Sequence, residues 1–178
     1  DGDIVVTGAF DQDGTGTNEL GGDLTASSIL FQGASSELTA NVNMTSGGGA
    51  GNDITFDNIL DGDGNGPWDL TLDAGNNGNI TLTGAVGGNT PLNDVTVTNA
   101  AAFTTVAGLT ANTLTSTGTG LTTLAGTTTV AEGMTVEAAG IAINGDLDSN
   151  GGVGVNLTAN TDDVTIADGV TIASDDAI

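Results

Sequence analysis

The amino-acid sequence predicts an all-β protein, and three observations support this prediction. The 178 residues include 30 glycines and no Lys or Arg, so good helix formers are scarce. Short β-branched segments recur between clusters of Gly, Asn and Asp, the usual pattern of strands separated by turns. Hydrophobic residues make up 37% of the chain, which is enough for a buried core, so we expect a folded protein rather than a disordered one.

Most predicted strands share one pattern, which is Asp or Asn, an aliphatic residue, Thr, and a second aliphatic residue. Alternation along a strand directs the aliphatic side chains to one face and the threonines to the other. We expect the leading Asp or Asn to bond the backbone of its own turn. The predicted strands are 3–8, 52–57, 68–73, 79–84, 94–99, 127–133, 134–138, 140–145, 155–159, 163–168 and 169–174.

The pattern repeats at uneven intervals. Its central threonines include Thr55, Thr71, Thr81 and Thr96. The gaps between them are 71 − 55 = 16, 81 − 71 = 10 and 96 − 81 = 15. We therefore expect one repetitive domain over 1–178, with a possible N-terminal segment 1–50 preceding a repeat region 51–178.

Two architectures are built from such strands, a parallel β-solenoid and an antiparallel sandwich or jelly roll. The solenoid is favoured because the turns are long and Gly-rich and lack the Asn-Gly spacing of tight hairpins. Aromatic residues are also too few for the core of a typical sandwich. They are Phe10, Phe31, Phe56, Trp68 and Phe103.

Charge restricts the function more sharply than any motif does. Asp and Glu number 23 and no residue is Lys, Arg or His, so the formal net charge is −23. Nucleic acid and anionic lipid are excluded as partners, because phosphate binding depends on basic side chains. We expect no membrane insertion. We also expect no enzymatic activity, since hydrolysis by paired carboxylates is the one catalytic chemistry that these residue types offer.

The stretch DGDGNGPWD, residues 61–69, has the spacing of a calcium loop. In such loops the side chains at the first, third and fifth positions converge on one ion, a backbone carbonyl comes from the seventh, and the ninth completes the shell. Here those ligands are Asp61, Asp63, Asn65, the carbonyl of Pro67, and Asp69. Two unpaired carboxylates 4 Å apart repel by about 4 kcal/mol, so we expect a Ca²⁺ ion to hold them together.

Two further stretches resemble this loop. DQDGTGTNE, residues 11–19, supplies Asp11, Asp13, Thr15 and Glu19. DLDSNGG, residues 146–152, supplies Asp146, Asp148 and Asn150, although Gly154 stands at the ninth position. The alternative interpretation is ordinary turn chemistry, which also uses Asp, Asn and Gly.

The segment ITFDNILDGDGNGPWDLTLDAGNNGNITLTGAVGGNTPLNDVTVTNAAAFTTVAGLTANTLTSTGTGLTTLAGTTTV, residues 54–130, resembles the β-strand repeats of large secreted bacterial surface proteins. These are the filamentous-haemagglutinin-like and autotransporter-like adhesins, in which DLTL-, NITLTGAVGG- and LNDVTVTNA-type blocks alternate. The resemblance implies an extracellular β-solenoid at the cell surface that serves adhesion or forms a stalk, with no catalytic residues.

Three functions follow as expectations. The first is a structural subunit or segment of an extracellular bacterial filament or stalk, which assembles with itself end to end, by strand stacking or strand donation, and is stabilised by calcium. The second is a calcium-dependent adhesin module that binds glycan or a surface. The third, a carbohydrate-active solenoid, requires two or three carboxylates that converge on one groove.

Overall fold

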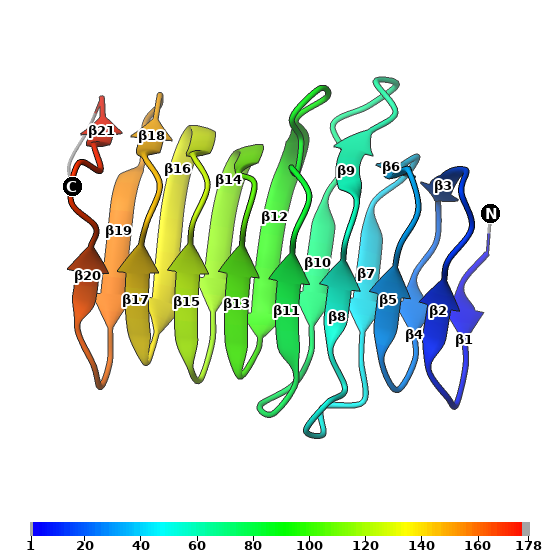
Figure 1. Cartoon of the computed structure of the whole chain (residues 1–178). Coiled ribbons are helices and arrows are strands. Elements are labelled where there is room, and N and C mark those ends of the chain that lie inside the picture. The colour runs from blue at the N-terminus through cyan, green and yellow to red at the C-terminus, as the bar shows by residue number, and fades with distance from the viewer. Residues whose placement is uncertain (1, 176–178) are drawn as a thin grey trace.

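The computed structural model describes residues 2–175, which form a β-solenoid of about eight turns (Figure 1). Every strand pair in this part of the chain is parallel. The prediction of an all-β solenoid is therefore confirmed, and the antiparallel sandwich alternative is wrong. No described segment forms a helix of the length and apolar character needed to span a membrane.

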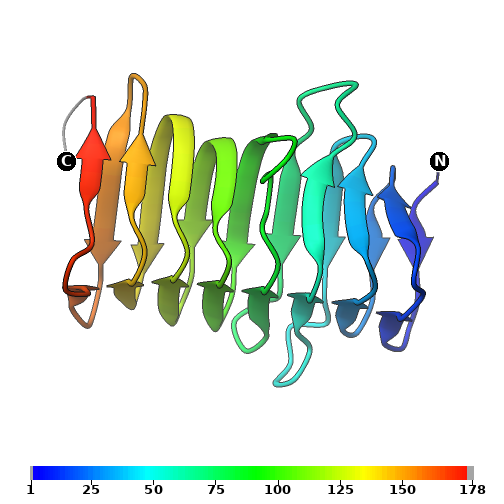
Figure 2. The same cartoon turned by 45° about the horizontal axis from the view of Figure 1, so that its top comes forward.

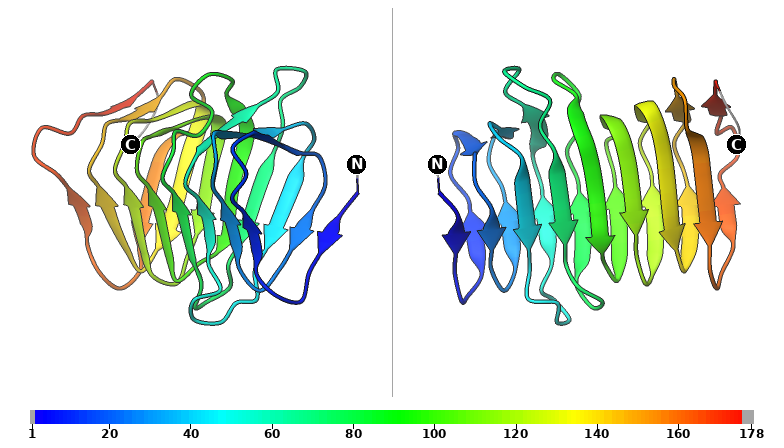
Figure 3. Two further views of the ribbon diagram at one scale, coloured as in Figure 1. Left: turned by 45° about the vertical axis from the view of Figure 1, so that its right-hand side comes forward. Right: turned by 180° about the vertical axis from the view of Figure 1, so that it is seen from behind.

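Each coil contributes a segment to three sides of the solenoid, which we call faces 1, 2 and 3. Face 1 lies at the back in Figure 1, and Figure 3 shows it from behind. Its strands are β1 (Ile4–Val5), β4 (Leu24–Thr25), β7 (Val42–Thr45), β10 (Leu70–Asp73), β12 (Leu92–Asn99), β14 (Leu109–Thr117), β16 (Thr128–Ala138) and β19 (Gly154–Ala159).

Face 2 is a sheet of eight strands, one from each coil, at the front of Figure 1. They are β2 (Phe10–Gln12), β5 (Ile29–Phe31), β8 (Ile54–Phe56), β11 (Asn79–Leu82), β13 (Ala102–Thr105), β15 (Leu121–Leu124), β17 (Gly140–Ile143) and β20 (Val164–Ile166).

Face 3 is built from shorter segments, which Figure 2 brings forward. Its separate strands are β3 (Thr17–Leu20), β6 (Ser35–Leu38), β9 (Ile59–Gly62), β18 (Leu147–Ser149) and β21 (Ile172–Ser174). Between β9 and β18, the ladder continues through a single bridge residue, Val86, and then through the first residues of β14 and β16. The strands β14 and β16 therefore turn the corner from face 3 to face 1.

Register explains the uneven threonine spacing. Thr55 pairs with Thr81 on face 2, whereas Thr71 pairs with Thr96 on face 1. Successive central threonines therefore belong to alternate faces, and the coil repeats are 81 − 55 = 26 and 96 − 71 = 25 residues. Elsewhere the repeat is shorter, for example 24 − 4 = 20 from Ile4 to Leu24, because loops inserted near residues 48, 65, 76 and 88 lengthen the middle coils.

Inward aliphatic side chains stack from coil to coil and form the core. On face 2, the buried side chains of Ile29, Ile54 and Ile80 lie in one register column. The Phe31 and Phe56 rings stack with centroids 4.7 Å apart, and Phe10 packs on Phe31 at 5.3 Å. These three rings thus pack across two neighbouring register columns, Phe10 in the column of Ile29 and Phe31 with Phe56 in the next.

Glycine at the corners allows one coil to pack directly on the backbone of the previous one. A Cβ at Gly120 would lie 1.6 Å from the carbonyl oxygen of Ala101. At Gly33, where φ is +102°, a Cβ would lie 2.1 Å from the carbonyl oxygen of Gly14. The many glycines of the sequence therefore include positions where a side chain would push two coils apart.

We predict that Gly120→Ala lowers the free energy of unfolding by about 1–3 kcal/mol, the usual cost of forcing an extra methyl group into a close contact. Urea denaturation followed by circular dichroism measures the effect. Gly152→Ala is the matched control, because a Cβ there has no atom within 4 Å. Equal effects of the two substitutions would contradict this account of the corners.

Candidate functional site

The carboxylate of Asp61, the first residue of the predicted calcium loop, binds amide donors of the next coil. Asp61 lies on β9 and is 7% exposed. It accepts hydrogen bonds from the side-chain amide of Asn89 (2.8 Å) and from the backbone N–H groups of Asn89 (3.1 Å) and Thr90 (3.5 Å). Asp61 therefore fastens the loop around residue 89 to face 3.

Asp63 binds a different set of donors, all within its own loop. The indole Nε1–H of Trp68 donates to Asp63 at 2.7 Å, and Asn65 donates from its side chain (2.7 Å) and its backbone (2.9 Å). Trp68 is half-buried and packs against the core. These bonds hold the pKa of Asp63 below its ordinary value, and the Trp68 hydrogen bond makes the largest contribution.

Asp69, the ninth residue of the loop, points its carboxylate toward the next coil along. It accepts hydrogen bonds from the side-chain amide of Asn93 (2.7 Å) and the backbone N–H of Asp94 (3.3 Å). Asp61, Asp63 and Asp69 thus have three separate sets of neutral N–H donors. Pro67, the predicted carbonyl ligand, lies beside a groove that is described below.

The predicted loop at 11–19 is a strand, a turn and a second strand. Asp11 lies on β2 and Glu19 on β3, while Asp13 and Thr15 are exposed in the turn between them. Glu19 pairs in register with Glu37, which pairs with Asp61. Three acidic residues therefore occupy one register column on successive coils of face 3.

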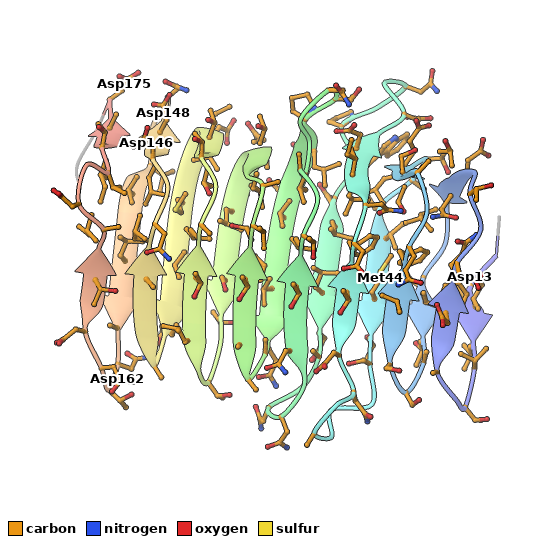
Figure 4. All side chains as sticks on the ribbon, in the orientation of Figure 1. Asp13, Met44, Asp146, Asp148, Asp162 and Asp175 are labelled. Atoms are coloured by element: carbon orange, nitrogen blue, oxygen red, sulfur yellow. The ribbon has the colours of Figure 1, made fainter. Side chains whose placement is uncertain are left out.

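Residues of the predicted loop at 146–152 also form bonds between neighbouring coils. Asp146 accepts the backbone N–H of Thr171 at 2.8 Å, and Asp148 lies on β18, in register with Ala173 of β21. The backbone N–H of Asn150 donates to the carbonyl of Val130. Figure 4 shows Asp146 and Asp148 at the C-terminal end of the solenoid, far from Asp13 at the other end.

Among residues 2–175, no group of three or more acidic side chains is arranged to hold a metal ion. Calcium binding thus stays a prediction from the sequence spacing. In the structure, neutral donors hold the carboxylates of the 61–69 loop.

A recurring bond between coils is the functional feature that the sequence interpretation missed. An Asp or Asn just before a face 1 strand accepts the backbone N–H at the same position of the next coil. The backbone N–H of Asp23 donates to the side chain of Asp3 (3.2 Å), and that of Asn43 donates to Asp23 (2.8 Å). In the same way, the N–H of Asp69 donates to Asn41 (3.0 Å) and that of Asp94 to Asp69 (3.3 Å). The leading Asp or Asn of the strand pattern therefore joins coils, in addition to shaping turns.

At the N-terminal end, the solenoid core is open. A cavity of about 380 Å³ is lined by inward side chains of the first two coils, including Ile4, Phe10, Leu20 and Leu24. Ile4 is 46% exposed, although its register partner Leu24 in the next coil is buried. The first coil therefore presents apolar surface that every inner coil buries.

The C-terminal end is open in the same way. Val164 and Ile166 of β20 are 38% and 52% exposed, whereas their partners Ile141 and Ile143 on β17 are fully buried. The two ends are at opposite extremes of the solenoid (Figure 1). Within the described part of the chain, no helix or loop covers either end.

Neither the cavity nor the groove beside Pro67 presents the carboxylate pair that glycoside hydrolysis requires. The cavity at the N-terminal end contains one carboxylate, Glu19, and the groove contains none. The expectation that the chain is not an enzyme stays a prediction. Comparison with protein-family models, curated proteins and solved structures finds no match.

We predict that Trp68→Phe raises the pKa of Asp63 toward its ordinary value of 3.8, because the substitution keeps an aromatic ring but removes the indole N–H. A carboxylate whose pKa is lowered by folding stabilises the protein above its unfolded pKa, and this stabilisation is lost as the pH falls through the folded pKa. Carboxyl ¹³C NMR titration of Asp63 measures the shift. Asn65→Ala should produce a smaller one, and an unchanged Asp63 titration in Trp68→Phe would refute the assignment.

We predict that Asp23→Ala lowers the free energy of unfolding by about 1 kcal/mol, because the N–H groups of Asn43 lose their acceptor. Asp23→Asn keeps an acceptor oxygen and should be nearly neutral. Asp13→Ala removes the same charge from an exposed turn and serves as the control. If Asp23→Ala and Asp13→Ala give the same stability in urea, the bond between coils contributes nothing measurable.

Proposed function

We propose that the chain is a structural subunit or segment of an extracellular filament or stalk, and that copies associate end to end. The observation that carries the proposal is the pair of open ends. Each end exposes inward aliphatic side chains and the unpaired edges of strands, the surface that a further coil covers inside the solenoid.

The hydrogen-bonding groups at the two ends are complementary. The carbonyl of Asp163 and the N–H of Ala167 bond to β17, so the N–H and C=O groups of Val164 and Ile166 point away from the molecule. At the other end, the N–H of Phe10 bonds to the second coil, which leaves the backbone groups of Asp11 facing outward. A second copy can therefore continue the parallel ladder.

The register columns define how two copies would meet. On face 2, one inward column begins at Phe10 and ends at Val164. On face 1, a second column begins at Ile4 and ends at Leu157. In the proposed joint, Val164 of one copy stacks on Phe10 of the next and Leu157 stacks on Ile4.

Such a joint propagates and does not close. The surfaces that meet are different, so each added copy leaves one end of each kind free. Whole coils stack in this arrangement, because each face has a strand at both ends. An assembly of this kind suits a filament or stalk outside the cell, as the resemblance to secreted surface proteins also implies.

In the proposed joint, calcium acts on the negative charge of the two ends. The joint brings the acidic side chains of the first coil toward those of the last, and the chain has no basic side chain to neutralise them. Cations from solution lower this repulsion. The acidic residues of these two coils are Asp3, Asp11, Asp13, Glu19, Asp162, Asp163, Asp168 and Asp175.

We predict that chelator-treated protein associates into linear species when calcium is added, and that the mass rises with protein concentration. Sedimentation velocity and light scattering measure the association, with magnesium and with sodium at equal ionic strength as controls. A response to calcium alone supports bound calcium at the joint, whereas equal responses to all three salts overturn the calcium part of the proposal. Protein that stays monomeric under every condition overturns the filament.

A matched pair of double variants tests the location of the joint. Ile4→Thr with Ile166→Thr changes exposed aliphatic residues at the two ends, which are 46% and 52% exposed. Val106→Thr with Leu121→Thr changes residues that are 46% and 49% exposed on the sides. The end variant should weaken association at least tenfold and the side variant should not; equal weakening would contradict joining through the ends.

A further inference from the structure

A groove runs along the corner between faces 3 and 1, separate from both ends of the solenoid. Its volume is about 440 Å³, within the range of small-ligand sites. It begins beside Pro67 and Pro91, where the inserted loops of the middle coils project (Figure 1), and continues over β14 and β16 as far as Asn150. It therefore crosses several coils and lies parallel to the solenoid axis.

One row of side chains in this groove repeats with the coils. Asn93, Asn112, Ala131 and Asn150 each follow one member of a register column, which consists of Leu92, Ala111, Val130 and Ser149. Successive positions are 19 residues apart, for example 112 − 93 = 19. Three of four successive coils thus place an amide in the groove, over about 14 Å at the usual strand spacing of about 4.8 Å.

Most polar side chains of the groove have no partner within the molecule. Asn93 donates to Asp69, but Asn112, Asn150, Thr110 and Thr129 make no side-chain hydrogen bond in the described structure. Thr110 and Thr129 are in register on neighbouring coils, beside the amides. The groove therefore combines uncommitted amide and hydroxyl groups with proline, alanine and leucine surface.

We propose that this groove binds a neutral polysaccharide in an extended conformation. Sugar hydroxyls both donate and accept hydrogen bonds, as do the amides and hydroxyls that line the groove. The apolar faces of pyranose rings suit its proline and alanine surface. An extended β-1,4-linked chain also advances by nearly the coil spacing per sugar, so successive sugars meet successive coils.

Other ligand classes fit less well. An anionic ligand would meet no basic group, since the chain has none, and a cationic ligand would meet no acidic residue in the lining. A peptide that adds a strand needs an unpaired strand edge. Along β14 and the first part of β16, the backbone already pairs with the coils on both sides and offers no free edge.

The test is titration of the ¹⁵N-labelled chain with cellohexaose and xylohexaose, which are neutral, and with a hexamer of galacturonate, which is anionic. We expect saturable shifts of the Asn112 and Asn150 side-chain amide signals with at least one neutral sugar, and none with galacturonate. No saturable shift with either neutral sugar, or shifts centred outside the groove, would overturn the proposal.

Variants make the test independent of filament formation. Asn112→Ala with Asn150→Ala should weaken sugar binding at least tenfold by calorimetry and leave end-to-end association unchanged. Asn144→Ala with Asn156→Ala removes two exposed amides outside the groove and should bind as wild type does. Equal loss of binding in the two double variants would place the sugar elsewhere and overturn the assignment.

Discussion

The structure depends on one constraint, which is that a chain of formal charge −23 without basic side chains must hold its carboxylates with neutral donors. Parallel coils in register supply such donors to several of these acids, because a backbone N–H group or an asparagine amide of the following coil lies beside the carboxylate. Asp23, Asp61 and Asp69 each bind the following coil in this way. Acidic residues that would destabilise many folds here connect successive coils.

The same register gives the ends of the solenoid their properties. An inner coil is covered on both sides, so its inward column is buried and its backbone is paired. The first and last coils have the same columns with one side uncovered, which explains why Ile4 and Ile166 are exposed while Leu24 and Ile143 are buried. The proposed self-association and the fold thus rest on one interaction, the stacking of a coil on a coil, and charge opposes both.

Much of the fold could be predicted from the sequence, because alternation of aliphatic residues with threonine indicates a strand with one buried face. The regions 52–57, 79–84 and 94–99 show it clearly, and each contains strand residues in the structure. Apart from the segment 3–8, which contains β1, the strands of the first coils could not be predicted in this way. Their strands, such as β2 and β3, are short and contain Asp11 and Glu19, so the spacing of acids and glycine indicated a metal loop instead. Over a stretch of this length, the sequence of a calcium loop and the sequence of a strand–turn–strand segment can look alike.

The candidate site shows a further limit of local patterns. Asp61, Asp63 and Asp69 are close in sequence, but two of their three donor sets come from coils 20 or more residues away. Only the coil length, which the uneven threonine gaps concealed, brings Asn89 and Asn93 to these acids. A sequence search for Asp or Asn recurring at intervals of one coil would have found part of this series of bonds between coils, since Asp3, Asp23 and Asn43 are each 20 residues apart.

The most direct test of end-to-end association is electron cryomicroscopy of the chain concentrated in calcium. We predict filaments one solenoid wide with an axial subunit repeat of about 38 Å, which is eight coils at about 4.8 Å each. Continuous strand spacing across the joint would show that Val164 stacks on Phe10 as proposed. Isolated solenoids, or assemblies in which subunits meet through their sides, would contradict it.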